Sequence, residues 1–546
     1  MPPAERVRLM LERCVRSLPK EQLEPNAVTQ TNLRANVTAL LGEGREIQVR
    51  TGYTRSERRM PTLRLNSPYA GAFQGEPDDP YPPALRPGDA FSTTTTDHVA
   101  RFLGSITAQW RLTRWLRARA TAGLDVTHTT NHALVPPGQS EAQLTGRVAD
   151  YRRNRTAETA ELGLTASFAY GRLSFRTSAG AQYVHTLTDE LRAARSDLTP
   201  GGSALQHASG TPTVSQVYGE TATLGSYLEQ TVGLNDRLFV TGALRVDGAS
   251  SFGTGYRAAV YPKANASWLI SDEPFFPRPR WLDELRVRYA FGVSGVQPGA
   301  TAALPTYSIV SAYAEGQVWS VPRLSFLRNP NLRPERVREH EYGFDLLVLN
   351  GRIRLDATRF HRRATDVITF ARVPNAIPRY LVNIGLVENH GYESSVSARI
   401  LDGEFASLTI ALHASSNENT ILDLGDADPF YTASGGTVEG YPLGARFYWP
   451  IESWADANGN GIIEAGEVQM ADSAAYAGRT TAPHHQSLSA SLALFSGRLR
   501  ISALANRQAG FTQLNTLRSS QCRLRLCRVH RFAPGEERIP GLRDGS

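Results

Sequence analysis

The chain has 546 residues, of which 41% are hydrophobic, and a formal net charge of +7 at pH 7. A mean hydropathy of −0.32, and the lack of any uninterrupted apolar run near the ~20 residues that a spanning helix needs, exclude a helical membrane protein. The basic residues are almost all arginines scattered along the chain without a concentrated patch, so no nucleic-acid partner is predicted.

The first 30 residues are predicted to lie outside the main fold. Residues 1–25 have no apolar core and no small-residue cleavage site, so they do not form a signal peptide. The run VRLMLERCVRSL within them has the pattern of a short amphipathic helix.

From residue 31 to residue 546 the chain repeats segments in which apolar and polar residues alternate, which is the period of a β-strand. Between residues 116 and 127, for example, leucine, alanine and valine alternate with arginine, threonine and aspartate. Arginines at every second position would surround a helix with charge. A barrel wall accepts them, because one face meets lipid and the other meets water.

Tight turns are predicted at one end of the strand pairs, at Asn235-Asp236, Asn350-Gly351, Asp402-Gly403 and Ser496-Gly497. Asn350-Gly351 in particular favours the positive φ angles of a type I′ turn. The other end opens into long segments, among them 57–96, 186–215, 297–334 and 419–483. We therefore predict an all-β fold, a transmembrane antiparallel β-barrel with roughly 16–18 strands, short periplasmic turns and long extracellular loops.

Aromatic residues gather near the ends of the predicted strands, which is typical of the two aromatic girdles of a membrane barrel. Ordinary packing is the alternative explanation for any single one of them. The residues are Trp110, Trp115, Tyr170, Trp268 and Tyr289.

Residues 456–467 read DANGNGIIEAGE and match the spacing of a calcium-binding loop. Side-chain oxygens would come from four of the predicted ligands, a backbone carbonyl from a fifth, and a direct or water-mediated contact from a sixth. The predicted ligands are Asp456, Asn458, Asn460, Ile462, Glu464 and Glu467. The alternative is an Asn/Gly-rich turn that binds no metal, and no other cofactor is predicted.

Neither the cysteines nor the potential catalytic residues indicate an enzyme. Cys522 and Cys527 are five residues apart and form either a disulfide or two free thiols. A G-x-S-x-G nucleophile elbow is absent from the sequence, and no set of serine, histidine and acidic residues has an indicated geometry. We expect no enzymatic activity, and a barrel enzyme remains a minor alternative.

Five blocks of sequence follow one another along the second half of the chain: RVDGASSFGTGYRAAVYPKANASWLISDEPFF (245–276), WLDELRVRYAFGVSGVQ (281–297), NPNLRPE with YGFDLLVLNGRIRLDATRFHRRATDVI (from 329), NIGLVENHGYE (383–393) and YPLGARFYW (441–449). In this order they resemble the barrel of SusC/RagA-type TonB-dependent outer-membrane transporters.

The resemblance implies a barrel of about 22 strands in the cell outer membrane that imports a large nutrient, typically a glycan or a peptide. It also implies an N-terminal plug, coupling to TonB, and a SusD-like surface lipoprotein as partner. The sequence contains no recognisable plug, TonB box or aromatic-terminated last strand. We therefore expect a barrel fragment that is truncated at both ends, with a passive porin or a non-functional remnant as the alternative.

Overall fold

The computed structural model describes residues 6–18, 27–60, 94–139, 144–314, 317–372, 379–383, 385–425, 429–431, 435–459, 463 and 465–514. Cys522 and Cys527 lie outside these residues. No helix in the described part of the chain is long and apolar enough to cross a membrane.

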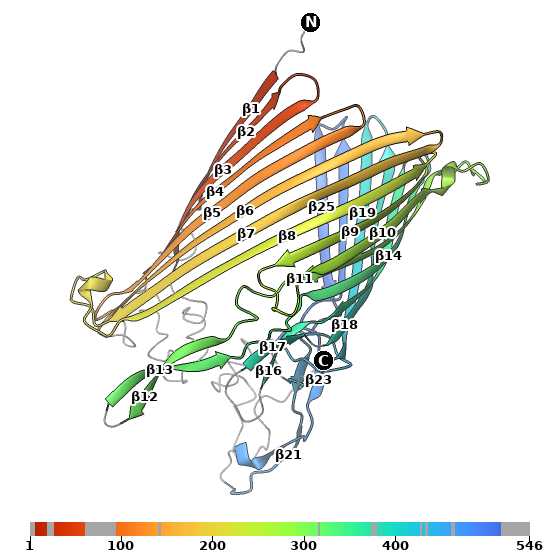
Figure 1. Ribbon diagram of the computed structural model, residues 1–546. Helices are drawn as coiled ribbons and strands as arrows, with labels where there is room; N and C mark the ends of the chain where they lie inside the picture. The colour runs from red at the N-terminus through yellow and green to blue at the C-terminus, as the bar shows by residue number, and fades with distance from the viewer. Residues whose placement is uncertain are drawn as a thin grey trace.

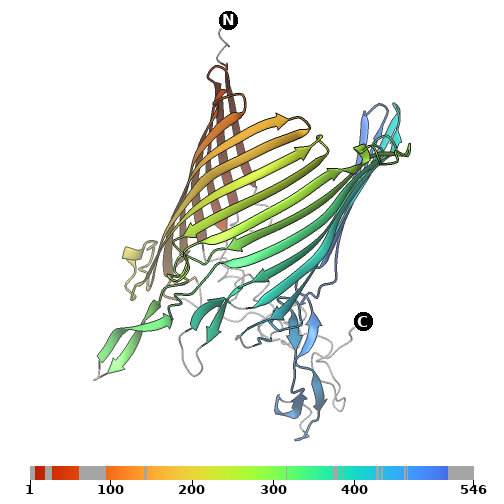
Figure 2. The same cartoon turned by 45° about the vertical axis from the view of Figure 1, so that its right-hand side comes forward.

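One 17-stranded sheet makes up most of the molecule, and it curls around a central space (Figures 1 and 2). Each strand pairs antiparallel with the next strand of the wall. In spatial order the strands are β1 (Arg6–Leu18), β2 (Ala27–Leu40), β3 (Arg45–Met60), β4 (Thr94–Arg111), β5 (Leu116–Val135), β6 (Arg147–Tyr170), β7 (Leu173–Ser196), β8 (Thr213–Leu234), β9 (Leu238–Ala249), β10 (Ala259–Leu269), β11 (Leu282–Val296), β14 (Glu335–Val348), β15 (Ile353–Thr365), β18 (Leu386–Asp402), β19 (Ala406–Asp423), β24 (His484–Leu494) and β25 (Leu499–Ala509). Within the described residues no pairing joins β1 to β25, so the sheet is open.

Smaller elements lie in the connections at one end of this wall. A four-stranded sheet contains β12 (Thr306–Ala314), β13 (Gln317–Phe326), β16 (Ile368–Arg372) and β17 (Arg379–Asn383). Two short pairs follow, β20 (Arg446–Tyr448) with β23 (Ala475–Gly478), and β21 (Ile451–Trp454) with β22 (Val468–Met470). Of the 3-10 helices, η3 (Leu205–His207) and η5 (Ala465–Glu467) lie at this same end, whereas η4 (Ile270–Asp272) lies in the β10–β11 connection at the opposite end.

The predicted fold is confirmed, both in its strand number and in the asymmetry of its connections. At the upper end in Figure 1, which we call the short-turn end, seven of the eight connections are two to four residues long. The long connections lie at the lower end, the long-loop end. Asn235 and Asp236 have φ of 54° and 56°, and Asn350 and Gly351 have φ of 55° and 74°. Backbone bonds from Arg237 to Leu234 (3.0 Å) and from Arg352 to Leu349 (3.3 Å) close both turns in the type I′ form.

The expected helix near the N-terminus is wrong. Residues Arg6–Leu18 form β1, which pairs with β2 along its whole length, so the sheet begins inside the segment that was expected to lie outside it. The register places Val7 opposite Ala39 and Leu9 opposite Val37. Alternate residues of this run are apolar, and the open edge of β2 offers its backbone groups a partner. These two features make the strand.

The expected loops differ from the structure in length or in content. Strand β7 ends at Ser196 and β8 begins at Thr213, so only 197–212 separate them, whereas the sequence predicted a loop over 186–215. These strands are 24 and 22 residues long, and their polar halves lack the apolar alternation that marks a strand in sequence. The segment 297–334 has its predicted bounds between β11 and β14, but it contains the β12–β13 hairpin.

The two faces of the wall differ in chemistry, and they alternate along each strand. One face, called here the apolar face, carries large exposed hydrophobic side chains such as Leu124, Leu164, Leu228 and Phe344. The opposite face, called the polar face, carries Arg101, Asp125 and their counterparts. Because the sheet is a single layer, no core lies within it. Among the described residues, the buried hydrophobic clusters lie at the long-loop end instead, one around Val148 at the start of β6 and one around Phe447 of β20.

Aromatic side chains border the apolar face near both ends of the wall. At the short-turn end Trp110, Trp115 and Tyr170 are 49%, 52% and 80% exposed, and the rings of Phe405 and Phe495 are 5.1 Å apart. Toward the long-loop end the rings of Tyr289 and Tyr342 are 5.2 Å apart. The structure therefore has two aromatic rows separated by an apolar band, the arrangement of a wall that faces lipid.

Candidate functional site

Charged side chains on the polar face form ion pairs between strands around most of the wall, either adjacent strands or strands separated by one other. Arg101 on β4 binds Asp125 on β5 through two hydrogen bonds, at 2.9 and 2.6 Å. Lys263 on β10 lies 3.2 Å from Glu229 on β8, and Arg362 on β15 binds both oxygens of Glu339 on β14. Exposed pairs of this kind contribute little to stability, about 0–1 kcal/mol each. They instead give the face a hydrated surface with both signs of charge.

The densest part of this surface is centred on Arg288 of β11. One nitrogen of its guanidinium lies 3.0 Å from Asp345 on β14 and 2.9 Å from Asp356 on β15. The two carboxylates face each other directly in the strand register. Like charges that face each other across strands repel, so Arg288 stabilises this pair.

Arg288 reaches β15 because the strand between them has a glycine at the crossing point. Gly343 of β14 stands directly opposite Arg288, and a Cβ atom there would lie 3.2 Å from the Arg288 nitrogen and 3.0 Å from Thr358 Oγ1. A side chain at this position would therefore have to displace the guanidinium. Arg245 of β9 makes the same kind of contact. Its side chain crosses Gly225 of β8 and donates a hydrogen bond of 3.0 Å to Gln182 of β7.

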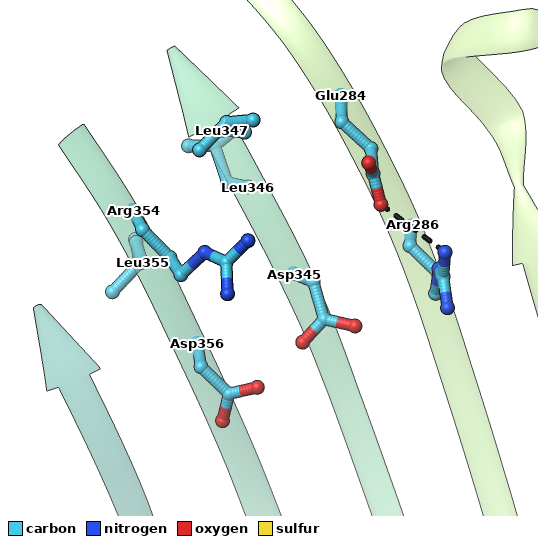
Figure 3. Close-up of a pocket in the computed structure, with 8 residues that line it drawn as sticks. All are labelled: Glu284, Arg286, Asp345, Leu346, Leu347, Arg354, Leu355 and Asp356. Carbon is cyan, nitrogen blue, oxygen red and sulfur yellow. Dashed lines mark hydrogen bonds and ion pairs between the residues drawn. The ribbon is translucent and has the colours of Figure 1, made fainter. Parts of the chain in front are cut away.

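Next to this cluster the polar face is hollowed near the short-turn end (Figure 3). The hollow has a volume of about 380 Å³. The side chains of Arg286 and Glu284 pair along one side at 3.2 Å, and Arg354, Asp345 and Asp356 point in from the two neighbouring strands. The arrangement offers both cations and carboxylates to a polar segment packed against this end of the wall.

Only part of the predicted calcium loop lies within the described residues. Asn460, Ile462 and Glu464 lie outside them, whereas Asp456, Asn458 and Glu467 lie inside. Glu467 Oε1 accepts the backbone N–H groups of Ala457 at 2.9 Å and Asn458 at 3.3 Å, so the two ends of the loop are held together. Within the described residues no group of three or more His, Cys, Asp or Glu side chains is arranged to hold a metal ion. Calcium binding here stays a prediction.

Sequence reasoning missed the cluster around Arg288. Arg288 and Asp356 are 68 residues apart, and their meeting depends on the register of three strands. The signal that the sequence did contain is the alternation itself, which places Arg286, Arg288 and Asp345 on the polar phase of their strands.

The comparisons with known proteins agree with the architecture. Residues 34–503 match the model of the family described as "TonB dependent receptor-like, beta-barrel". The TonB-dependent receptor SusC of Bacteroides thetaiotaomicron is 28% identical over 283 residues, which are 46% of this chain and 28% of that protein. The chain therefore spans well under two thirds of the length of this relative.

Among solved structures, the RagAB peptide transporter superposes with a TM-score of 0.73 and 16% identity over 89% of this chain and 58% of that one. The ferric-catecholate import receptor Fiu from E. coli superposes with a TM-score of 0.56 and 13% identity, covering 92% and 67%. At these identities the structures show a shared fold. By their names, these relatives are receptors and transporters.

Proposed function

Because this chain belongs to the TonB-dependent receptor-like β-barrel family, we propose that it forms the wall of an outer-membrane importer for a large nutrient such as a glycan or a peptide. The single observation that carries this proposal is the contrast between the faces of one sheet. An apolar band between two aromatic rows suits lipid, and a face of paired charges suits a water-filled passage. The relatives are receptors and transporters, and we propose that this chain too is not an enzyme.

The proposed function implies one orientation of the wall in the outer membrane. The apolar face would contact lipid and the polar face would line the passage. The short turns would lie in the periplasm and the long loops at the cell surface, as is usual for outer-membrane barrels. Substrate would then enter at the long-loop end, where the β12–β13 hairpin and η3 project beyond the wall (Figure 1).

The partners follow from the same proposal. A SusD-like lipoprotein would dock at the long-loop end and capture substrate, and TonB would supply energy from the periplasmic side. The similarity to SusC and to the RagAB transporter supports this assignment. The hollow beside Arg288 faces the passage near the short-turn end, where a plug would pack against the wall.

The orientation is tested by labelling single cysteines on intact cells. In a variant whose three natural cysteines are serine, Ser203→Cys places a thiol in the exposed connection 197–212, and Asp236→Cys places one in an exposed short turn. A membrane-impermeant maleimide is expected to label the first variant on intact cells and the second only after the outer membrane is opened. The reverse pattern would contradict the proposed orientation.

Transport itself is tested by deleting the gene in its own organism. Growth is compared on a panel of glycans and peptides, each as sole carbon or nitrogen source. We expect loss of growth on one class, and the same loss in a strain without TonB. Normal growth of the deletion strain on every substrate tested would contradict the import proposal, and a defect that does not depend on TonB would favour a passive pore.

We also propose that the loop 456–467 binds calcium weakly at the cell surface. The closed position of Glu467 against the N–H groups of Ala457 and Asn458 supports it, because calcium loops of this type place a bidentate carboxylate at the twelfth position. Isothermal titration of the purified protein is expected to give a dissociation constant of about 0.1–1 mM, the range of extracellular modules. Glu467→Gln should weaken binding about tenfold or more, whereas Glu452→Gln, outside the loop, should not. Equal binding by both variants would place any calcium elsewhere.

A further inference from the structure

Three histidines stand in one row across adjacent strands of the wall. The register places His340 of β14 opposite His361 of β15, and His361 opposite His390 of β18. All three occupy the phase of the apolar face, the phase of Phe344, Ala357 and Val396. The next residues on this face toward the long-loop end are Arg338 and Arg363, which also stand opposite each other.

The six side chains that we call the arginine–histidine patch are Arg338, His340, Arg359, His361, Arg363 and His390. On the side toward the short-turn end, the patch borders Tyr342 and Tyr392, which stand on either side of Arg359 in the register. Beyond these tyrosines, the apolar face of β15 carries only Ala357, Leu355 and Ile353. The patch therefore begins where the lipid-facing band ends.

Few negative charges face the patch from the strands around it. Glu388 of β18 is shared between His361 at 2.7 Å and Arg363 at 2.8 Å. Glu418 of β19, opposite His390, lies 3.6 Å from Arg479. From β11, Tyr289 contributes a hydroxyl 3.0 Å from His340 Nδ1, and from β24, His484 bonds Ser416 at 3.1 Å.

The patch consequently carries an excess of positive charge even when its histidines are neutral. No described carboxylate lies within ion-pair distance of Arg338 or Arg359, and both side chains are exposed. Two arginines directly opposite each other destabilise the strand pairing unless an anion lies between them.

From this arrangement we infer that the arginine–histidine patch binds the phosphate groups of lipids in the leaflet at the long-loop end. The partner is a lipid because the patch adjoins the apolar band on the same face, so acyl chains and headgroup contact one continuous surface. Arginine side chains near such a border extend toward the headgroups. Phosphate oxygens match guanidinium groups, and Arg338 and Arg363 stand directly opposite each other in the register. The inference rests on the proposed membrane placement but is independent of transport.

The test compares lipids that differ only in phosphate. The purified full-length protein is titrated in detergent micelles with diphosphoryl lipid A, or with the same lipid after removal of its phosphates, and bound lipid is measured by native mass spectrometry. We expect the phosphorylated lipid to bind about tenfold more tightly or better at pH 7.5, since each arginine near a charged surface has a substantial effect.

Two variants separate the contributions within the patch. R338Q/R363Q is expected to remove most of the preference for phosphate. H340Q/H361Q/H390Q keeps the three arginines and should therefore weaken the preference much less than R338Q/R363Q does. The control R117Q/R119Q changes two exposed arginines on the polar phase of β5 and should bind lipid as the unchanged protein does. Circular dichroism of each variant confirms that it contains the β-structure of the parent.

Each outcome decides the inference. Equal binding of both lipids, or a preference that R338Q/R363Q keeps, overturns it. Competition by millimolar inorganic phosphate that is as strong as that of the lipid would show a free-anion site and would also overturn it. Reconstitution into vesicles provides the separate check on placement. Failure of the unchanged protein to insert would reject the proposed membrane placement, whereas insertion without a preference for phosphate would reject this inference alone.

Discussion

Replacement of Leu164 by arginine is expected to destabilise the folded wall by about 2–4 kcal/mol, the cost of an arginine on the lipid face of a barrel near the midplane. Leu164 is 50% exposed on the apolar face of β6, and it lies between Tyr170 at the short-turn end and Glu158, the first charged residue of this face toward the long loops. The guanidinium would have to leave water without a partner, or distort the bilayer to keep one.

The adjacent residue provides a matched control. Thr165 points to the polar face, where its hydroxyl lies 3.1 Å from that of Ser178. Thr165→Arg adds the same side chain one position further along the same strand, and it should change stability by less than about 1 kcal/mol, because that face accepts charge. Denaturant unfolding in phospholipid vesicles measures both variants. Equal destabilisation would show that the faces do not differ in environment.

Removal of the cation between Asp345 and Asp356 should have the second-largest effect. Arg288→Met keeps much of the side-chain volume but leaves two carboxylates facing each other in the register. A fully buried pair would cost several kcal/mol to break. Arg288 is 37% exposed on its side chain, so solvent screening reduces the expected loss to about 1–2 kcal/mol.

A double-mutant cycle separates this repulsion from simple loss of packing. If the loss comes from the facing carboxylates, Asp356→Asn should restore most of the stability in the Arg288→Met background and should itself destabilise the unchanged protein. The measurement is again the free energy of unfolding in vesicles. Additive effects of the two substitutions would show that Arg288 contributes through packing alone.

The short hairpins of the wall could be predicted from sequence because their information is local. The dipeptides Asn235-Asp236 and Asn350-Gly351 tolerate positive φ, and apolar alternation on each side marks the paired strands. The same alternation gave the class of fold and the approximate number of strands. In a membrane barrel the alternation is clear wherever one face of a strand contacts lipid, because the residues on that face have to be apolar.

Where neither face of a strand has to be apolar, the alternation is weak and the sequence predicts the strand poorly. The polar halves of β7 and β8, beyond Tyr183 and toward Ser196 and Thr213, look like loop in sequence, and only pairing with their neighbours makes them strands. The edge strand β1 had apolar residues compatible with a helix or a strand, and the partner β2 decided between them.

The sites depend still more on register. Alternation assigns Arg288 and Asp356 to the polar phase, but nothing in the sequence states that β11, β14 and β15 are neighbours whose offsets bring these side chains together. The same holds for His340, His361 and His390, which are separated by 21 and 29 residues in sequence and form one row only through two registers.

The open seam of the sheet has a consequence that follows from strand direction alone. β1 begins at the short-turn end, with Arg6 opposite Leu40, and β25 begins there too, with Leu499 opposite Leu494. In an antiparallel sheet of 17 strands the first and the last necessarily point the same way. Direct joining of these two edges would therefore create a parallel pair. Antiparallel closure requires an odd number of further strands, whichever segment or chain supplies them, and the total then becomes even, as in bacterial outer-membrane barrels.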